Sequence, residues 1–274
     1  MGSVPHVAAL YRYPIKGFAP EQREQLEVEP GGRIAGDRVL AFRYANATEP
    51  QERDGLDYWP KGGGLCVRDY PGLTRLALDY TGEEVRLRVG DQVLAQAGLD
   101  DGGRTGLVSA VTEFLLGTPD GARLAREGHL PLSLVGDGHT ATFTDRPRGF
   151  VTAHSRTSLA ELGQAVGAEL DERRFRSNIA LDGLDAWAED DLIGHQVRIG
   201  PLLFDVVAPI VRCLATHANP ETGLRDAPVM TTLTRSLGRK EPSFGILMLP
   251  AGGAGALADG GGTITVGDEV ENLD

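Results

Sequence analysis

Arg212 and Cys213 place a cation beside one of the two thiols in this 274-residue chain. A neighbouring positive charge favours the thiolate, which is the form that attacks electrophiles and binds soft metals. A lone cysteine can equally be a small buried hydrophobic residue, so the pair by itself leaves both interpretations open. We predict that Cys213 is a metal ligand. A metal-free alternative makes Cys213 a nucleophile that pairs with His217 or His154.

A second group of candidate residues lies upstream, where residues 174–181 are predicted to form a strand. Side chains alternate between the two faces of a strand, so Arg174, Arg176 and Asn178 would share one face. Guanidinium groups bind phosphate oxygens through paired hydrogen bonds, and a carboxamide offers both a donor and an acceptor. This face therefore predicts a site for a phosphate joined to a polar heterocycle. The alternative is a set of surface ion pairs with three nearby acids, Glu169, Asp171 and Glu172.

The other cysteine and the histidines carry less information. Cys66 has the context of a strand, which favours a structural role. The six histidines show neither an H-E-x-x-H motif nor the spacings of a structural zinc site. Two cysteines are too few for the common iron–sulfur clusters, so a redox role would require electrons from another protein. The same count argues against a disulfide framework and fits a reducing compartment.

The composition is that of an acidic globular protein. Hydrophobic residues make up 41% of the chain, and the formal net charge is -12 at pH 7. Nonspecific binding to nucleic acid or to an anionic membrane requires a basic surface, so this charge argues against both partners. No apolar run approaches the roughly 18 residues of a membrane span, and the N-terminus lacks the pattern of a signal peptide. We expect a cytoplasmic protein.

Short strands are the elements that must position these residues. Residues 4–15 are predicted as a strand that ends just before Lys16, and residues 37–43 as a strand that contains Arg38. The remaining strands are expected at 73–80, 130–135, 149–153, 196–199, 203–207, 244–249 and 263–266, with a hairpin at 84–96 and helices at 105–117, 158–167 and 228–237. Cys66 would lie in a strand that precedes the turn at residues 71–72.

Many short strands and few helices predict a β-rich α+β fold built on a barrel or a sandwich. A boundary is expected near residues 118–121, Thr-Pro-Asp-Gly, which divides the chain into domains 1–120 and 121–274. The polar, glycine-rich segment 46–64 is predicted as a surface loop that could act as a lid. The segment 251–262 is predicted as a flexible hairpin loop.

Several short motifs follow one another along nearly the whole chain. They are Tyr13-Pro14-Ile15-Lys16, Gly36-Asp37-Arg38, Arg68-x-x-Pro71-x-Leu73, Phe175-Arg176-Ser177-Asn178-Ile179, Ala188-Glu189-Asp190, Arg212-Cys213, Thr216-x-x-Asn219-Pro220-x-Thr222-Gly223 and Gly267-Asp268. In this order they resemble the MOSC-domain family with its MOSC N-terminal β-barrel domain, as found in the amidoxime-reducing members and their bacterial relatives. The resemblance implies a MOSC domain at 121–274 with a MOSC-type β-barrel. It also implies a smaller N-terminal β-rich domain at 1–120 with one or two helices.

The resemblance also implies a molybdenum cofactor, in which a pterin dithiolene and one protein cysteine hold the metal. Cys213 matches that cysteine, and a soft thiolate suits such a metal. Lys16 and Arg38 match positions that hold the phosphate of the cofactor. Three more residues match positions around the pterin: Arg176, Asn178 and Arg212.

Three replacements depart from the family pattern: Gly17 for a serine at the phosphate, Ser177 for a proline, and Val211 for a small polar residue. These changes bear on substrate identity more than on cofactor binding. The segment 145–155 is expected to line the open side of the metal. Within it, His154 and Arg148 are candidates with no assigned role.

The resemblance implies a molybdenum-dependent oxidoreductase that reduces N-hydroxylated substrates by two electrons taken from a separate donor protein. An alternative is a carrier of the cofactor or of sulfur that uses Cys213 without reducing a substrate, as in the C-terminal part of molybdenum cofactor sulfurases. A metal-free sulfur-transfer enzyme is a third hypothesis. Molybdenum content separates the first two hypotheses from the third, and turnover separates a reductase from a carrier.

Overall fold

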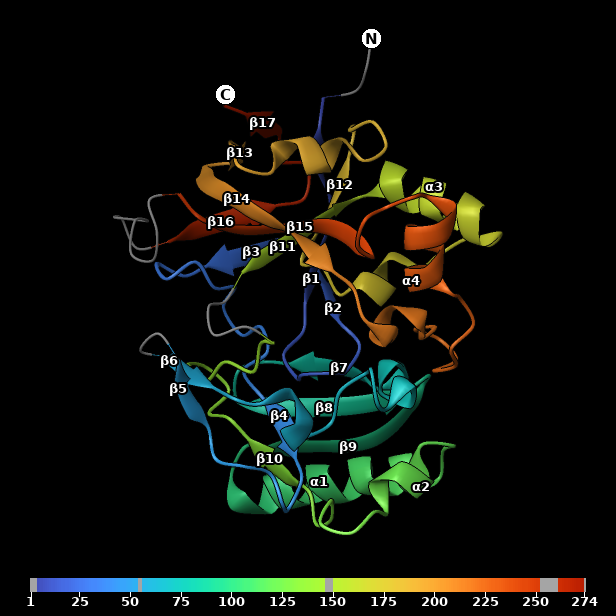
Figure 1. Cartoon of the computed structure of the whole chain (residues 1–274). Coiled ribbons are helices and arrows are strands. Elements are labelled where there is room, and N and C mark those ends of the chain that lie inside the picture. The colour runs from blue at the N-terminus through green and yellow to red at the C-terminus, as the bar shows by residue number, and fades with distance from the viewer. Residues whose placement is uncertain (1–3, 54–55, 146–149, 252–260, 274) are drawn as a thin grey trace.

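The computed structural model describes residues 4–53, 56–145, 150–251 and 261–273. Two hydrophobic cores lie one above the other in Figure 1. The upper core packs around a large sheet, and the lower core packs between a small sheet and helix α1 (Asp101–Leu116). Within the described ranges, no helix combines the length and the apolar character needed to cross a membrane.

The large sheet contains eight strands in the order β17-β13-β14-β15-β11-β12-β1-β2. Their bounds are β1 (His6–Arg12), β2 (Glu21–Arg23), β11 (Val151–Ser155), β12 (Ile179–Asp182), β13 (Gln196–Ile199), β14 (Leu202–Val211), β15 (Ser243–Pro250) and β17 (Val270–Asn272). Neighbours are antiparallel except for β11 and β12. The sheet closes on itself because the Val7 amide donates to the Asp268 carbonyl and the Val270 amide to the Pro5 carbonyl, both at 2.8 Å. The predicted β-rich fold with a barrel is therefore confirmed.

The N-terminal strand β1 belongs to the same sheet as the second half of the chain, because it lies between β12 and β2. Val7 packs in the upper core, whereas Ile15 already packs in the lower core. The chain thus passes from one core to the other directly before Lys16. The two cores do not divide at the boundary between the predicted domains 1–120 and 121–274.

The lower core is built from a three-stranded sheet, a short strand pair and one long helix. The strands are β7 (Ala77–Tyr80), β8 (Glu84–Val89) and β9 (Gln92–Gly98), with β4 (Ala41–Arg43) paired to β10 (Ser133–Val135). The predicted hairpin at 84–96 is confirmed as β8 and β9. Helix α1 ends before Gly117 as predicted, but it begins four residues earlier. Asp100 caps it by accepting a hydrogen bond from the Gly103 amide at 2.8 Å.

A third group of buried residues fills the space under helix α3 (Arg156–Val166), beside the large sheet. The predicted helix at 158–167 is confirmed, although it begins two residues earlier, at Arg156, where Ser155 caps it. The other elements are β3 (Gln25–Val28) paired with β16 (Gly262–Thr265), β5 (Gln51–Arg53) paired with β6 (Leu56–Tyr58), α2 (Gly121–Leu124), α4 (Val229–Thr231), the 3-10 helices η1 (Lys61–Gly63), η2 (Pro71–Arg75), η3 (Glu172–Phe175), η4 (Ala188–Leu192) and η5 (Leu214–His217), and the π-helix η6 (Thr232–Ser236). The predicted lid loop 46–64 thus contains a short hairpin, with residues 54–55 outside the described ranges. Most of the predicted loop 251–262 also lies outside them.

Two predicted strands are shorter than expected because an arginine interrupts each of them. In residues 37–43, extended pairing begins late because Arg38 has a φ angle of 54°. In residues 174–181, η3 comes first and Arg176 also has a φ angle of 54°, so β12 begins only at Ile179. The predicted alternation of Arg174, Arg176 and Asn178 on one face of a strand is therefore wrong.

Two further predictions of extended structure are wrong in the lower core. Residues 71–75 form η2, and the strand predicted at 73–80 begins only with β7. Cys66 does not lie in a strand, because it precedes a turn at residues 67–69. Proline at the start of η2 explains the first error, since its fixed φ angle suits the first turn of a helix.

Candidate functional site

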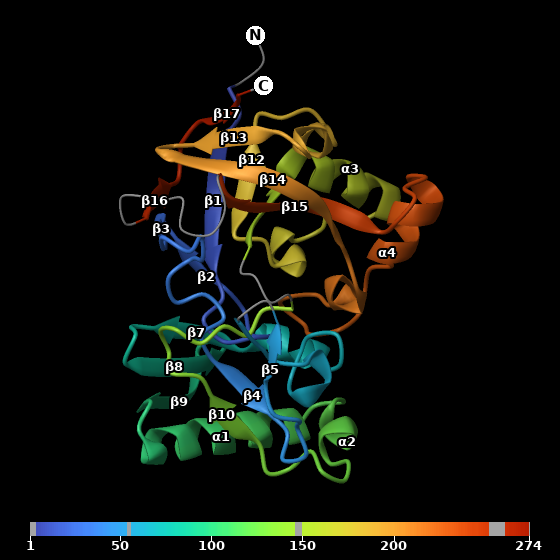
Figure 2. The ribbon, with the colours of Figure 1, turned by 60° about the vertical axis from the view of Figure 1, so that its left-hand side comes forward.

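A cavity of about 330 Å³ lies where the two cores meet. In both views the chain that follows β14 runs down to this junction (Figures 1 and 2). Of the described residues that line it, only Asp145 carries a carboxylate, against six cationic side chains. The cations are Lys16, Arg38, Arg68, Arg174, Arg176 and Arg212. The cavity is therefore strongly positive in a protein whose net charge is -12.

Cys213 lines this cavity directly after strand β14. The strand extends past the predicted end at residue 207 and continues through Pro209, where the pairing register with β15 shifts between Pro209 and Val211. The carbonyl of Cys213 accepts hydrogen bonds from the Thr216 amide and hydroxyl, at 3.1 and 3.0 Å. These bonds fix the backbone of the cysteine at the cavity wall.

Arg212 extends into the upper part of the molecule, where its guanidinium contacts backbone carbonyls and the rings of Phe175 and Phe244. Its Nε donates to the Phe244 carbonyl and its Nη1 to the Phe175 carbonyl, both at 2.7 Å. Its Nη2 is buried and finds no hydrogen-bond partner among the described residues. Burial lowers the pKa of Arg212 to about 9, although Cys213 opposes the shift. The surroundings thus disfavour this cation unless an anion binds nearby.

Arg38 and Arg176 both stack on Tyr13. Their guanidinium carbons lie 4.9 and 4.4 Å from the centre of its ring. Both arginines have φ angles of 54°, in the left-handed region that residues with a Cβ rarely adopt. Arg38 Nη2 also donates to the Arg176 carbonyl at 3.1 Å. Two strained arginines are therefore joined through one aromatic ring at the cavity.

The two stacked arginines differ in their electrostatic partners. Arg38 forms an ion pair with Asp37, and this carboxylate outweighs the effect of burial and raises the pKa of Arg38. Arg176 donates to the Phe18 carbonyl at 2.7 Å and forms no ion pair within the described ranges. Burial lowers the pKa of Arg176 to about 10. Arg176, like Arg212, is thus a half-buried cation without a carboxylate partner among the residues that the structure describes.

Lys16 lines the cavity where the chain crosses between the cores. Its Nζ lies 3.1 Å from Oδ1 of Asp145, whose side chain is half exposed. Asp145 begins the segment that was predicted to line the open side of the metal. Phe150 and Thr152 of that segment also line the cavity, whereas Arg148 lies outside the described residues.

Asn178 is the one residue with a predicted cofactor contact that does not appear among the described residues lining the cavity. It is fully buried, and its Oδ1 accepts a hydrogen bond of 2.8 Å from the Thr152 hydroxyl. Its Nδ2 donates to the Tyr11 carbonyl at 3.2 Å and to Asp37 Oδ1 at 3.3 Å. Asn178 therefore lies behind the wall and holds Thr152 in place. Its predicted cofactor contact stays a prediction.

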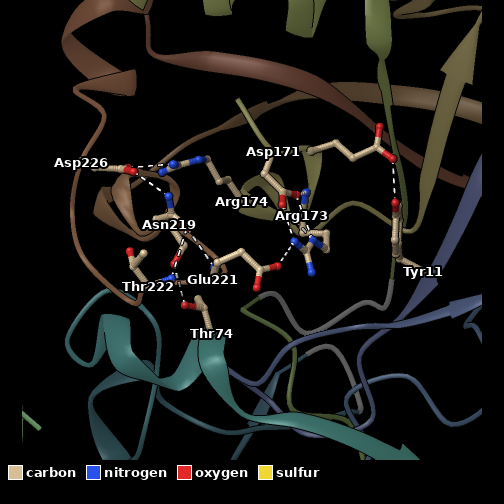
Figure 3. Close-up of polar contacts among 10 residues, drawn as sticks. Tyr11, Thr74, Asp171, Arg173, Arg174, Asn219, Glu221, Thr222 and Asp226 are labelled. Carbon is tan, nitrogen blue, oxygen red and sulfur yellow. Dashed lines mark hydrogen bonds and ion pairs between the residues drawn. The ribbon is translucent and has the colours of Figure 1, made fainter. Parts of the chain in front are cut away.

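Arg174 lines the cavity and belongs to the network of polar contacts shown in Figure 3. Its Nη2 lies 2.7 Å from Asp226 Oδ1, and its Nη1 donates to the His217 carbonyl at 3.1 Å. The side-chain Nδ2 of Asn219 also donates to Asp226 Oδ2, at 2.6 Å. Arg174 is almost fully buried, so its contacts differ from the surface ion pairs considered as the alternative.

The Asn-Pro-x-Thr-Gly motif forms the turn that connects this network to the lower core (Figure 3). The side-chain oxygen of Asn219 accepts from the amides of Glu221 and Thr222, at 2.9 and 3.3 Å. Thr74 in η2 donates to the Asn219 carbonyl at 3.1 Å. Gly223 follows with a φ angle of 68°. The motif therefore docks the chain after Cys213 onto the other core.

Neither candidate histidine partner lines the cavity. His154 is fully buried beside the rings of Phe175 and Phe244, whose centres lie 6.2 and 5.7 Å away. Neither of its ring nitrogens has a hydrogen-bond partner in the described part of the chain. The Nε2 of His217 accepts from a backbone amide at 3.2 Å. The structure thus keeps both imidazoles behind the wall that carries Cys213.

Cys66 and Arg68 are among the cavity residues that sequence reasoning did not assign to the site. The motif Arg68-x-x-Pro71-x-Leu73 includes Arg68, but no pattern in the sequence indicates that residues 66 and 213 lie at the same cavity. Cys66 donates to Asp69 at 3.2 Å, and burial together with this bond raises the pKa of Cys66 to about 11. In the described ranges, no group of three or more His, Cys, Asp and Glu side chains could hold a metal ion.

Comparison with known proteins supports the resemblance. Residues 141–271 match the family model of the MOSC domain. Mitochondrial amidoxime-reducing component 1 of Mus musculus is 32% identical over 118 residues, which are 42% of this chain and 34% of that protein. Molybdenum cofactor sulfurase of Drosophila grimshawi is 31% identical over 116 residues, 42% of this chain and 14% of that protein. The chain thus spans about a third or less of these relatives.

Among solved structures, the YUAD protein from Bacillus subtilis matches with a TM-score of 0.41 and 11% identity, and the match covers 98% of this chain and 96% of that one.

Proposed function

We propose, for a chain that carries a MOSC domain at residues 141–271, that the cavity binds molybdenum cofactor and that the protein uses it to reduce N-hydroxylated substrates. One observation carries this proposal. Arg176 and Arg212 lie half-buried at a cavity wall without a carboxylate partner among the described residues, beside the soft thiol of Cys213. Buried cations require compensating negative charge. An anionic ligand with a soft metal satisfies both the cations and the thiol.

The residues of the cavity fit the chemical groups of this cofactor. Lys16 and Arg38 come from the crossing between the cores and would hold the phosphate, since each can donate several hydrogen bonds. Arg176 and Arg212 would face the pterin and offset the negative charge of the dithiolene attached to it. Cys213 would bind the metal as a thiolate, because coordination removes the proton of a thiol. Lys16 would exchange its contact with Asp145 for the phosphate.

The proposed reaction consumes two electrons and two protons: R–NHOH + 2 e⁻ + 2 H⁺ gives R–NH₂ + H₂O. When bound, the cofactor would supply a metal that changes its oxidation state by two electrons. We propose that the electrons come from a separate donor protein, because two cysteines are too few for an iron–sulfur cluster of the common type.

The protein side chains prepare the site for this reaction. Thr216 fixes the backbone of Cys213 through two hydrogen bonds, so the thiol is held in position before the metal arrives. Apolar side chains that line the cavity, including Phe150 and Leu247, reduce the access of water to the reacting atoms. Arg212 adds a positive charge beside the thiolate and stabilises it.

A second candidate function is a carrier of the cofactor or of sulfur. It is favoured by the 31% identity to a molybdenum cofactor sulfurase, which is close to the 32% identity to an amidoxime-reducing component. A carrier would use the same cavity and the same cysteine. It would bind the cofactor without reducing a substrate.

Elemental analysis of purified protein, followed by a turnover assay, tests these proposals. We expect stoichiometric molybdenum in the wild-type protein and in Cys66→Ser, and loss of molybdenum in Cys213→Ser. Wild-type molybdenum content in folded Cys213→Ser would refute the assignment of the ligand. Turnover of an amidoxime with a chemically reduced viologen as electron donor would support the reductase. Bound molybdenum without turnover of hydroxylamines or amidoximes would instead support the carrier.

A further inference from the structure

Arg68 is the cavity cation that the proposed cofactor leaves unassigned. Lys16 and Arg38 would hold the phosphate, and Arg176 and Arg212 would face the pterin. Arg174 already has a carboxylate partner, Asp226, at 2.7 Å. Arg68 lines the same cavity from a turn of the lower core, and 42% of its side chain is exposed. It therefore lies at the opening of the cavity rather than at its buried wall.

The ion pair of Arg68 does not cancel its positive charge. Its Nε and Nη2 both donate to one oxygen of Asp69, at 3.2 and 2.7 Å, and no contact of Nη1 is found within the described ranges. Asp69 is shared with a second guanidinium, since Arg123 Nη1 lies 3.4 Å from its other oxygen. Two arginines and one aspartate carry a net charge of about +1. A positive charge with a free donor edge thus remains at the opening.

Arg68 also lies within electrostatic reach of Cys213. The hydrogen bond to Asp69 is the main cause that raises the pKa of Arg68, so this side chain stays cationic, and it lines the same cavity as Cys213. A substrate whose N–O group approaches a metal at Cys213 would therefore extend past this guanidinium. The overall charge of -12 repels anions at long range, so selection of an anion requires a local cation of this kind.

We propose that Arg68 binds a carboxylate group of the substrate at the opening of the cavity, so that the protein prefers anionic N-hydroxylated compounds. This inference rests on the proposed cofactor site. The carboxylate would take the unpaired edge of the guanidinium through charge-assisted hydrogen bonds. Arg68 thus determines which substrates bind, while the cofactor reduces them.

The test compares two substrates and two variants of the cofactor-loaded protein. 4-Carboxybenzamidoxime carries the anion, and benzamidoxime is its neutral analogue. Arg68→Gln should lower kcat/KM for the carboxylate by about tenfold more than for the neutral compound, mainly through KM, as expected for one lost charge-assisted contact. Arg123→Gln is the matched control. It removes a guanidinium of the same 42% exposure from the same Asp69, but it does not line the cavity.

Equal effects of Arg68→Gln and Arg123→Gln on the two substrates would show that Arg68 only supports Asp69, and the inference would be wrong. If the loaded protein does not turn over either compound, calorimetric titration with benzoate and benzamide makes the same comparison through binding. The inference then requires tighter binding of benzoate and its loss in Arg68→Gln. Protein that binds no molybdenum would refute the proposed function and this inference together. Loaded protein that fails to distinguish the anion refutes the inference alone.

Discussion

Replacement of His154 by leucine should stabilise the protein, and the gain should grow as the pH falls. His154 is fully buried, and neither ring nitrogen has a hydrogen-bond partner in the described part of the chain. Glu172 is the nearest acid, but the 3.7 Å between its Oε2 and the imidazole Nε2 exceeds hydrogen-bond distance. A buried polar group left without a partner costs about 1–3 kcal/mol. His154→Leu removes this cost and keeps a side chain of similar size.

The pH dependence follows from the direction of the pKa shift. Burial lowers the pKa of His154 below the usual value of about 6.5, although Glu172 opposes the shift. Below pH 6.5 the unfolded chain therefore binds a proton at this imidazole more readily than the folded protein. The wild type should lose up to about 1.4 kcal/mol of stability for each pH unit below 6.5 from this residue. His154→Leu should escape that loss.

Urea unfolding of wild type and His154→Leu at pH 7.5, 6.5 and 5.5 measures the effect. We expect the leucine variant to be about 1 kcal/mol more stable at pH 7.5, after the loss of ring contacts with Phe175 and Phe244 is subtracted. The difference should widen between pH 6.5 and 5.5. Parallel stability curves would refute the argument. His139→Leu, an exposed replacement, controls for the loss of a histidine.

Three further predictions concern the cavity and its supports. The double variant Lys16→Ala, Arg38→Ala should lose most of its molybdenum, because the proposed phosphate then has no cationic ligand at the crossing; unchanged occupancy by elemental analysis would contradict the assignment. Cys66 should react with iodoacetamide at a half-maximal rate near pH 11, as its raised pKa implies, and mass spectrometry of the alkylated peptide at several pH values tests this. Gly223→Ala should destabilise the protein by about 2 kcal/mol, because a Cβ there would lie 2.8 Å from a backbone atom of the lower core at a φ angle of 68°. Urea unfolding measures the loss, with Gly106→Ala, which meets no neighbouring atom, as control.

Local patterns predicted the elements whose conformation depends on neighbours in the sequence. The hairpin at 84–96 is confirmed because alternation and a Gly-Asp turn specify it without help from the rest of the chain. The motif resemblance likewise selected Lys16, Arg38, Arg212 and other residues that the structure brings to one cavity. The order of the motifs along the chain predicted these residues because each motif contributes one part of a site that distant segments form together.

The conformation around Arg176 could not be predicted from alternation. The alternating pattern assumes a uniformly extended backbone, but Arg176 adopts a left-handed conformation that places its guanidinium over Tyr13. Arg38 adopts the same left-handed conformation, and its guanidinium also lies over the ring of Tyr13. Cys66 and Arg68 were missed for a different reason, since only the packing of the two cores brings them to the cavity. Contacts between residues far apart in the sequence determine where these four side chains lie, and no pattern of neighbouring residues predicts such contacts.

Backbone strain and uncompensated positive charge occur together at the cavity. Among the described residues, the non-glycine positions with positive φ angles are Arg38, Arg176 and Trp187, and two of the three line the cavity. A left-handed residue with a Cβ costs about 1–2 kcal/mol. The half-buried guanidiniums of Arg176 and Arg212, which have backbone carbonyls but no carboxylate as partners among the described residues, add a further cost. Strain and uncompensated charge gathered at one cavity are expected where a ligand supplies the compensation. A bound anion would therefore stabilise the folded protein as well as take part in its chemistry.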